Sequence, residues 1–271
     1  MTSPRMVALA VTLTAAFALA ACGGKGEDSA SDVETVVVTE TSGAGDSGSP
    51  TDATSTDTAV PSTSPTAPMQ SMTIEPTGKI DEAELAADIQ AAQDVTNAFW
   101  KRHWKDYFTG RYTKPNVYGL YDGYDEAGSP VCFGEPLPPG NAFYCPDGDY
   151  VAWDKTLLEL GYEIGDSWPY LIIAHEWGHA IQADLDVSLQ SEQYELQADC
   201  LAAAALYGAS ADHILKFQPG DEKEIVDGLN YIADEVPWGM SGDHGDSFQR
   251  IESFDTGRTG GVPACLPGMT G

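Results

Sequence analysis

The stretch Leu171–Asp184, LIIAHEWGHAIQAD, decides the fold of this chain, because it predicts a buried helix with a polar centre. His175 and His179 are four residues apart, so an α-helix places both imidazoles on one face, within reach of one metal ion. Glu176 lies about 100° round the helix from His175, where it can contact a water on that ion. The H-E-x-x-H spacing therefore indicates a zinc hydrolase site with two ligands and a general base.

The residues around this polar trio are uncharged, from Leu171 to Ile181, and a solvated helix would not be so apolar. Pro169 suits the first helical turn, with Asp166 or Ser167 as the N-cap. The competing interpretation is a buried helix with two structural histidines and an incidental glutamate.

A catalytic zinc site needs a third protein ligand and leaves the fourth position to water. The layout with a third histidine downstream is excluded, because Gln182 and Leu185 stand where it needs Gly and His. Glu195 and Asp199 offer the other layout, since they lie four residues apart on a predicted following helix. We expect Glu195 to be the third ligand and Asp199 to hydrogen-bond a ligand imidazole. The apolar run after Asp199 predicts that this helix is buried, which disfavours a solvated acidic face.

Composition limits the functions that the whole chain can have. Its 271 residues carry a net charge of −29, which excludes a nucleic-acid partner because phosphates would not be neutralised. Residues 1–21 resemble a bacterial lipoprotein signal peptide, with Arg5 ahead of an apolar stretch and Cys22 after small residues. Residues 22–78 are rich in Ser, Thr, Pro and Asp, which predicts a disordered linker. We therefore expect cleavage before Cys22, lipidation of its sulfur, and a folded domain over residues 79–271.

This organisation predicts a protein anchored by lipid to the outer face of the cell membrane. The alternative is an ordinary secretory signal with a chance cysteine at its end. In an oxidising compartment the other four cysteines should form disulfides, with three possible connectivities. We pair Cys132 with Cys145, which flank a Gly/Pro-rich loop, and this leaves Cys200 with Cys265. Reduced, buried thiols are the alternative.

Periodicity predicts a mainly helical α+β domain with a small β-hairpin or sheet ahead of the metal helix. Arg111 to Pro146 is loop-rich, and Gly161, Gly208 and Gly257 are expected to end or interrupt helices. One of the strands could pair with an extended substrate backbone. The expected helices cover residues 81–108, 154–160, 191–207, 222–235 and 247–254, and the expected strands cover 141–145 and 150–153.

Four segments, AHEWGHAIQ, ELQADCLAAA, FYCPDGDYVAWD and HGDSFQRIESFDTG, resemble the bacterial neutral zinc metallopeptidase family. That family is similar to the gluzincins in its ligand plan, and the resemblance covers about residues 80 to 266. It implies a zincin-like fold, one Zn²⁺ per chain held by His175, His179 and Glu195, and Glu176 as the catalytic residue. Trp177 is bulky for its place beside the site, which raises the question of how open the site is.

The expected reaction is zinc-dependent hydrolysis of a peptide or protein substrate, with Glu176 taking a proton from the attacking water. The oxyanion of the tetrahedral intermediate needs a second electrophile besides zinc. His244, on a Gly-flanked loop, is the first candidate. Tyr194 and His213 are the runners-up. Two alternatives remain open: a non-catalytic metal-binding protein of the cell envelope, and a zinc amidase that acts on cell-wall peptides.

Overall fold

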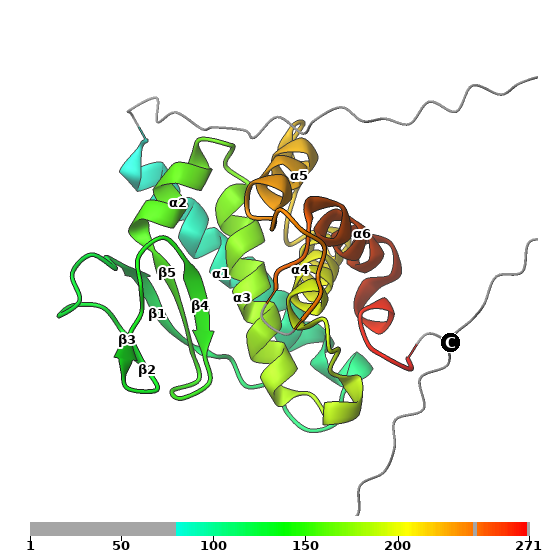
Figure 1. The fold of residues 1–271 in the computed structure, drawn as a ribbon. Helices are drawn as coiled ribbons and strands as arrows, with labels where there is room; N and C mark the ends of the chain where they lie inside the picture. Colours follow the sequence, from blue (N-terminus) through cyan, green and yellow to red (C-terminus); the bar gives the residue numbers. More distant parts are fainter. Residues whose placement is uncertain (1–79, 241–242, 270–271) are drawn as a thin grey trace, which may run out of the picture. The chain divides into compact units, whose positions relative to one another are not determined.

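The computed structural model describes residues 80–240 and 243–269. The expected signal peptide (1–21), Cys22 and the linker (22–78) lie outside the described residues. Figure 1 shows the helices and strands in chain order. The helices are α1 (Glu82–Tyr107), α2 (Lys155–Tyr162), α3 (Trp168–Asp184), α4 (Tyr194–Ala211), α5 (Asp221–Tyr231) and α6 (Ser247–Ala264), with a 3₁₀ turn at Val187–Leu189.

The strands form a small three-stranded sheet in the order β1-β5-β4, made of β1 (Asn116–Tyr121), β4 (Ala142–Cys145) and β5 (Tyr150–Asp154). β4 and β5 are antiparallel, which confirms the predicted hairpin, and β1 runs parallel to β5. A separate two-stranded ladder joins β2 (Val131–Cys132) and β3 (Glu135–Pro136). The mainly helical α+β class is therefore confirmed.

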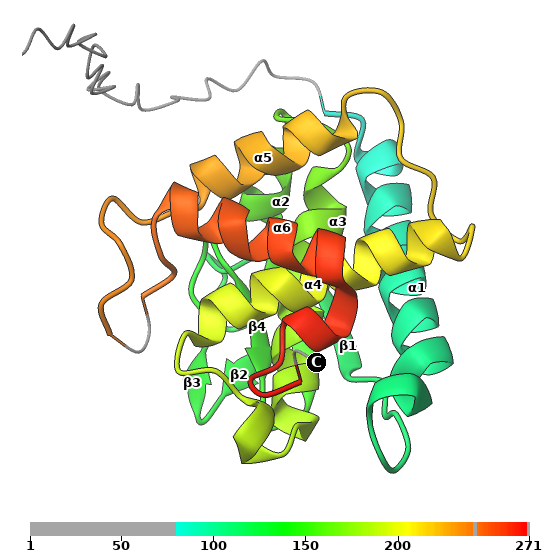
Figure 2. The ribbon, with the colours of Figure 1, turned by 90° about the vertical axis from the view of Figure 1, so that its right-hand side faces the viewer.

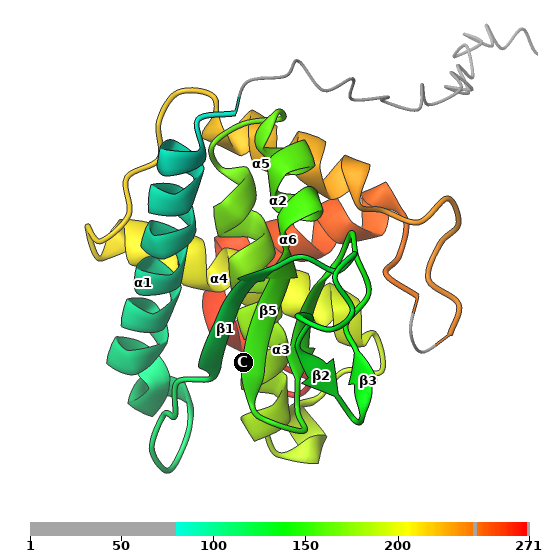
Figure 3. The same ribbon diagram turned by 90° about the vertical axis from the view of Figure 1, so that its left-hand side faces the viewer.

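The expectation that residues 111–146 are loops was wrong for β1. This strand pairs out of register between Val117 and Gly119, and Gly119 has a φ of +91°. Such a bulge interrupts the two-residue alternation by which a strand is detected in a sequence. Figure 3 shows β1 and β5 on one side of α3, and Figure 1 shows the edge strand β4 next to that helix.

Helix α3 lies between the sheet and α4, and it is buried on almost every side (Figure 1). Its apolar residues Leu171, Ile173 and Trp177 are completely inaccessible to solvent. α1 covers another side of α3 and brings Phe99 and Trp100 into the same core. Truncation of a leucine at such a position costs about 2–5 kcal/mol, so the core holds the histidines of α3 on a rigid support.

Three glycines that were expected to end or interrupt helices lie inside helices instead. A Cβ on Gly161 would lie 1.8 Å from the Trp168 ring, and one on Gly208 would lie 2.2 Å from the Phe99 ring. A Cβ on Gly257 would lie 1.9 Å from the Cys200 carbonyl oxygen. These predictions were wrong because each glycine serves a close contact with another part of the chain, which local sequence does not reveal.

The ends of three helices also differ from the prediction. α4 begins at Tyr194 rather than near residue 191, and α5 ends at Tyr231 rather than near residue 235. α6 continues to Ala264, with a break at Gly261, whose φ of 63° is left-handed. Figure 2 shows α6 lying across α4.

Both predicted disulfides, Cys132–Cys145 and Cys200–Cys265, are present. The first joins the β2–β3 ladder to β4, and the second joins α4 to the end of α6. Among the helices of the described residues, none combines the length and apolar character that a membrane crossing requires.

Candidate metal centre

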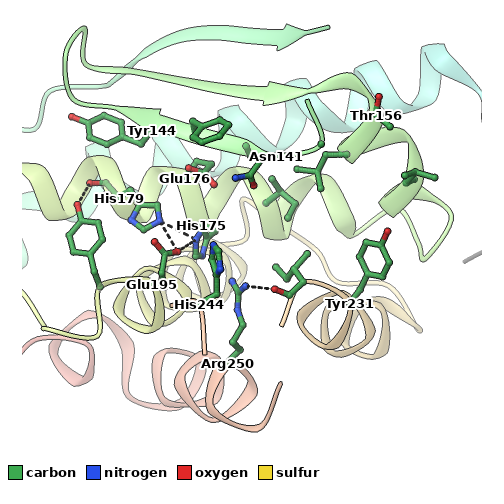
Figure 4. A pocket seen from close by; sticks show the side chains of 18 of the residues that line it. Asn141, Tyr144, Thr156, His175, Glu176, His179, Glu195, Tyr231, His244 and Arg250 are labelled. Carbon is green, nitrogen blue, oxygen red and sulfur yellow. Dashed lines mark hydrogen bonds and ion pairs between the residues drawn. The ribbon is translucent and has the colours of Figure 1, made fainter. Parts of the chain in front are cut away.

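Helices α3 and α4 bring the three predicted ligands to one point, which Figure 4 shows at close range. The Nε2 atoms of His175 and His179 are 3.1 Å apart. Each of these nitrogens is 3.2 Å from Oε2 of Glu195. Two imidazoles separated by one helical turn thus meet a carboxylate from the first turn of α4, as the sequence predicted.

The outer nitrogen of each imidazole is fixed by a buried partner. His175 Nδ1 donates to Asp199 Oδ1 over 2.8 Å, as predicted. His179 Nδ1 donates to Gln182 Oε1, also over 2.8 Å. The amide nitrogen of Gln182 is turned the other way, because it donates to the Tyr194 carbonyl. Both rings thus use Nδ1 as a donor and turn Nε2 toward the same point as the Glu195 carboxylate, so that each neutral ring would offer an Nε2 lone pair to a cation there.

Three electron-rich atoms that converge in this way need a cation between them. Ligands about 2.0–2.1 Å from a tetrahedral ion lie about 3.3 Å apart, close to the separations observed. The set of two imidazoles and one carboxylate leaves room for a fourth ligand, which suits a catalytic rather than a structural site. The residues therefore fit a divalent metal ion.

A proton takes the place of the metal when no cation is bound. Burial alone would lower the pKa of His175, but the Asp199 carboxylate and then Glu195 outweigh it and raise that pKa to about 10. Burial likewise opposes ionisation of Glu195, yet hydrogen bonds from both imidazoles hold its pKa well below the usual range. These shifts show that the site favours an ionised Glu195 next to a positive charge, which a protonated imidazole or a metal ion can supply.

Asp199 has a second partner that the sequence analysis missed. Arg250 of α6 donates from Nε to Oδ2 and from Nη2 to Oδ1 of Asp199, both over 2.8 Å. Arg250 also donates from Nη1 to the Ile232 carbonyl over 3.1 Å. Asp199 and Arg250 are both buried. Burial would raise the pKa of Asp199, but Arg250 and His175 lower it, so the carboxylate that orients His175 stays ionised.

Glu176 lies beside the ligands on α3 and faces a cavity of about 750 Å³. Burial raises the pKa of this carboxyl, whereas the neighbouring imidazoles and the backbone N–H of Tyr144 act in the opposite direction. The pKa of a general base works best near the operating pH, so a raised value suits proton transfer. Glu176 is not among the three converging ligand atoms, which agrees with the role predicted for it.

The cavity runs between the edge strand β4 and the helices that carry the site. Ala142 and Tyr144 of β4 line one side, and Leu157, Ile172 and Tyr231 line an apolar part. Tyr144 and Tyr231 are labelled in Figure 4. The outer edge of β4 has no strand partner among the described strands, so its backbone can offer donors and acceptors to an extended chain. This arrangement suits a peptide that lies along β4 with one side chain in the apolar part.

The three candidate electrophiles differ in position. His244 lines the cavity, and its backbone N–H donates to Asp234 Oδ2 over 2.7 Å, while its Nδ1 lies 3.5 Å from Asp234 Oδ1. Tyr194 also lines the cavity, stacked on His179 with ring centroids 4.9 Å apart. His213 is exposed beyond the end of α4 with a φ of +61°, and it does not line the cavity.

Trp177 does not obstruct the site. Its ring is fully buried, and Nε1 donates to the Tyr112 hydroxyl over 2.8 Å, away from the residues that line the cavity. The tryptophan therefore anchors α3 to the loop after α1.

Gln182, Asp234 and Arg250 complete the surroundings of the site and were not predicted. Gln182 had a usable signal, because it lies three residues after His179 and so on the same helix face. Arg250 had a weaker signal, since a buried Asp199 needs a cationic partner. No protein-family model, curated protein or solved structure matches this chain.

Proposed function

We propose that this protein is a zinc-dependent peptidase of the gluzincin type, with a zincin-like fold. One observation carries the proposal: three ligand atoms 3.1–3.2 Å apart converge next to a buried carboxylate, Glu176, on the wall of a cavity. A purely structural site has no use for that carboxylate and is usually closed by four protein ligands.

His175, His179 and Glu195 would hold the ion. When bound there, zinc would supply Lewis-acid chemistry, polarising a carbonyl and lowering the pKa of water. Glu176 accepts the proton of the attacking water and passes it to the leaving amine. His244, held by Asp234, is the first candidate to stabilise the developing oxyanion, with Tyr194 as the second.

The cavity supports a peptide or protein as the substrate. An extended backbone can pair with β4, whose outer edge has no strand partner within the described sheet. Residues 140–144 and Pro146 line the cavity along this strand, so several substrate residues can be held. An internal segment of a longer chain fits such an open-edged groove, which favours an endopeptidase.

The proposed location is the outer face of the cell membrane, with a lipid anchor at Cys22. The two disulfides support an oxidising compartment, because such bonds are rare in the cytosol.

Zinc content and hydrolysis, measured together, test this function. Glu176→Gln should keep one zinc per chain and lose peptide hydrolysis by about 10²–10⁴-fold, as expected for a general base that is not a ligand. Glu195→Ala should lose the zinc, whereas His213→Ala, outside the cavity, should keep both metal and activity.

Undiminished hydrolysis by Glu176→Gln would contradict the assigned base. Cleavage of casein or a peptide library, compared with muropeptides and with chelator present, separates a peptidase from a cell-wall amidase. A protein that binds zinc and cleaves neither would be the non-catalytic alternative.

A further inference from the structure

The imidazole of His179 is connected to the C-terminal part of the protein by a chain of buried amides. Gln182 accepts from His179 Nδ1 over 2.8 Å and donates from Nε2 to Gln197 Oε1 over 3.0 Å. Gln197 in turn donates from Nε2 to the Cys265 carbonyl over 3.0 Å. Both glutamines are buried, at 0% and 4% exposure, so neither amide can exchange its partners for water.

The direction of this hydrogen-bond chain is fixed at its far end. A backbone carbonyl can only accept, so the Cys265 oxygen requires the nitrogen of the Gln197 amide to face it. The oxygen of Gln197 then faces Gln182, and the oxygen of Gln182 faces His179. The carbonyls of Leu189 and Tyr194 accept from the same two amide nitrogens and reinforce this direction. The result is an imidazole that donates from Nδ1 and turns Nε2 toward Glu195, where its lone pair can bind a metal ion.

The Cys200–Cys265 disulfide holds the end of this chain in place. Cys200 follows Asp199 directly, so the same bond is adjacent to the carboxylate that orients His175. The disulfide is therefore linked to both histidines: to His175 through Asp199, and to His179 through Gln197 and Gln182. A hydrogen bond also holds α6 against α4, because the Ser253 hydroxyl donates to the Leu196 carbonyl over 2.5 Å.

We propose that Gln182 and Gln197 are positioning residues for His179, and that the Cys200–Cys265 disulfide holds them, so that metal affinity depends on the integrity of this disulfide. The proposal rests on the proposed metal site. Loss of the bond frees the Cys265 carbonyl to move and leaves the far end of the Gln197 amide held by the Leu189 carbonyl and the Ser191 N–H. Both amides are then held less firmly, and the fraction of molecules with a correctly placed His179 lone pair falls.

Zinc affinity and the visible absorption of the Co²⁺-substituted protein test this proposal. Affinity is measured by competition with a chromogenic chelator, using the purified folded protein. Gln182→Leu should weaken zinc binding by about 10–100-fold and change the Co²⁺ bands, which report ligand geometry. Gln197→Leu, and separately the pair Cys200→Ala and Cys265→Ala, should weaken it by about tenfold, the lower end of that range.

Two matched controls distinguish positioning from general damage. Gln190→Leu removes a glutamine that donates to the carbonyls of Gln182 and Leu185 but touches neither imidazole. The pair Cys132→Ala and Cys145→Ala removes the other disulfide, which joins the β2–β3 ladder to β4. Both should leave zinc affinity and the Co²⁺ bands unchanged, even where stability falls.

Coupling between the variants decides whether the disulfide acts through Gln197. Removal of Cys200–Cys265 should weaken zinc binding in the wild type and add little in the Gln197→Leu background. An equal loss in both backgrounds, or unchanged affinity of Gln182→Leu, would overturn the proposal. If the cysteine variant does not fold, Gln197→Leu with both disulfides intact decides it: weaker binding supports the amide chain and unchanged binding refutes it. Failure of the proposed function would look different, because the wild type itself would bind no zinc.

Discussion

Among residues 80–240 and 243–269, two groups of side chains each bring three potential metal ligands within 4.8 Å of one another, yet only one of these groups is organised around a centre. The inner cluster is His175, His179 and Glu195, and the outer cluster is Asp166, Asp221 and Glu224. In the inner cluster both histidines are buried and Glu195 is half-buried, whereas in the outer cluster Asp166 is exposed and the other two carboxylates are half-buried.

The difference lies in what holds each ligand. In the inner cluster the nitrogens that do not face the centre are bound to Asp199 and Gln182. In the outer cluster Glu224 already accepts from the backbone and hydroxyl of Ser167. Burial, together with repulsion from Glu224 and Asp221, raises the pKa of Asp166. Carboxylates that lie close together thus repel one another, whereas the held imidazoles and carboxylate of the inner cluster fit a metal ion.

The largest effect should follow from breaking the support of the inner cluster. Arg250→Leu leaves Asp199 as a buried charge without its bidentate partner, so the free energy of unfolding should fall by about 3–5 kcal/mol. Urea denaturation of the metal-free protein measures this loss. A change below 1 kcal/mol would show that His175 alone satisfies Asp199.

Zinc should stabilise the protein through the inner cluster only. At a free zinc concentration of about 100 times Kd, the free energy of unfolding should rise by about 2.7 kcal/mol. Glu195→Gln should abolish most of this gain. The same substitution in the outer cluster, Glu224→Gln, is the matched control and should retain it. Loss of the gain in Glu224→Gln instead would place the metal in the outer cluster.

Zinc binding to the inner cluster should also release protons. The pKa of His175 in the metal-free protein is about 10, above its usual value, so the ring is charged at pH 8 and must become neutral to bind metal. Calorimetry in buffers of different ionisation enthalpy should therefore show release of roughly one proton per zinc at pH 8. Zinc uptake without proton release would contradict the raised pKa.

The same pKa shift predicts how the stability of the metal-free protein depends on pH. Because the folded-state pKa of His175 is raised, its contribution to stability is complete below the unfolded pKa of about 6.5 and is lost as pH rises to about 10. Denaturation at both pH values, with and without zinc, measures this loss. Bound zinc should remove the His175 part of it, because the ring is then neutral.

The smallest effect should come from the outer cluster. Asp166→Asn removes a repelled charge, so it should raise the free energy of unfolding at pH 7 by up to about 0.5 kcal/mol, the range of surface substitutions. The gain should shrink in high salt, which screens exposed charges, and vanish near pH 3 as the carboxyls protonate. A destabilised Asp166→Asn protein would indicate that a cation binds the outer cluster.

The inner cluster was predictable from sequence because most of its information is local. His175, Glu176 and His179 share one helix face, and Glu195 and Asp199 share another, so two short patterns specify the ligands. The disulfide pairing followed from the even number of cysteines and from the Gly/Pro-rich loop between Cys132 and Cys145. Helices α1 and α3 were similarly clear, since their apolar residues repeat along a single element.

The supports of the cluster were not predictable in the same way, because they join distant segments. Arg250 is 51 residues from Asp199, and Gln197 is 68 residues from Cys265. Strand β1 was missed because its partner β5 follows only after β2, β3 and β4, and because its bulge hides the alternation. Such contacts depend on tertiary packing, and a single sequence carries no periodic signal for them.

The missing side chain of Gly257 has a consequence for the inner cluster. α6 approaches α4 so closely that a methyl group at this position would overlap the Cys200 carbonyl. Two turns earlier on the same helix, Arg250 donates to Asp199 across the same close contact between α6 and α4. Gly257 therefore allows the short distance between α4 and α6. A larger residue at this position, which contacts neither histidine nor Glu195, would push apart the two helices that carry Asp199 and Arg250.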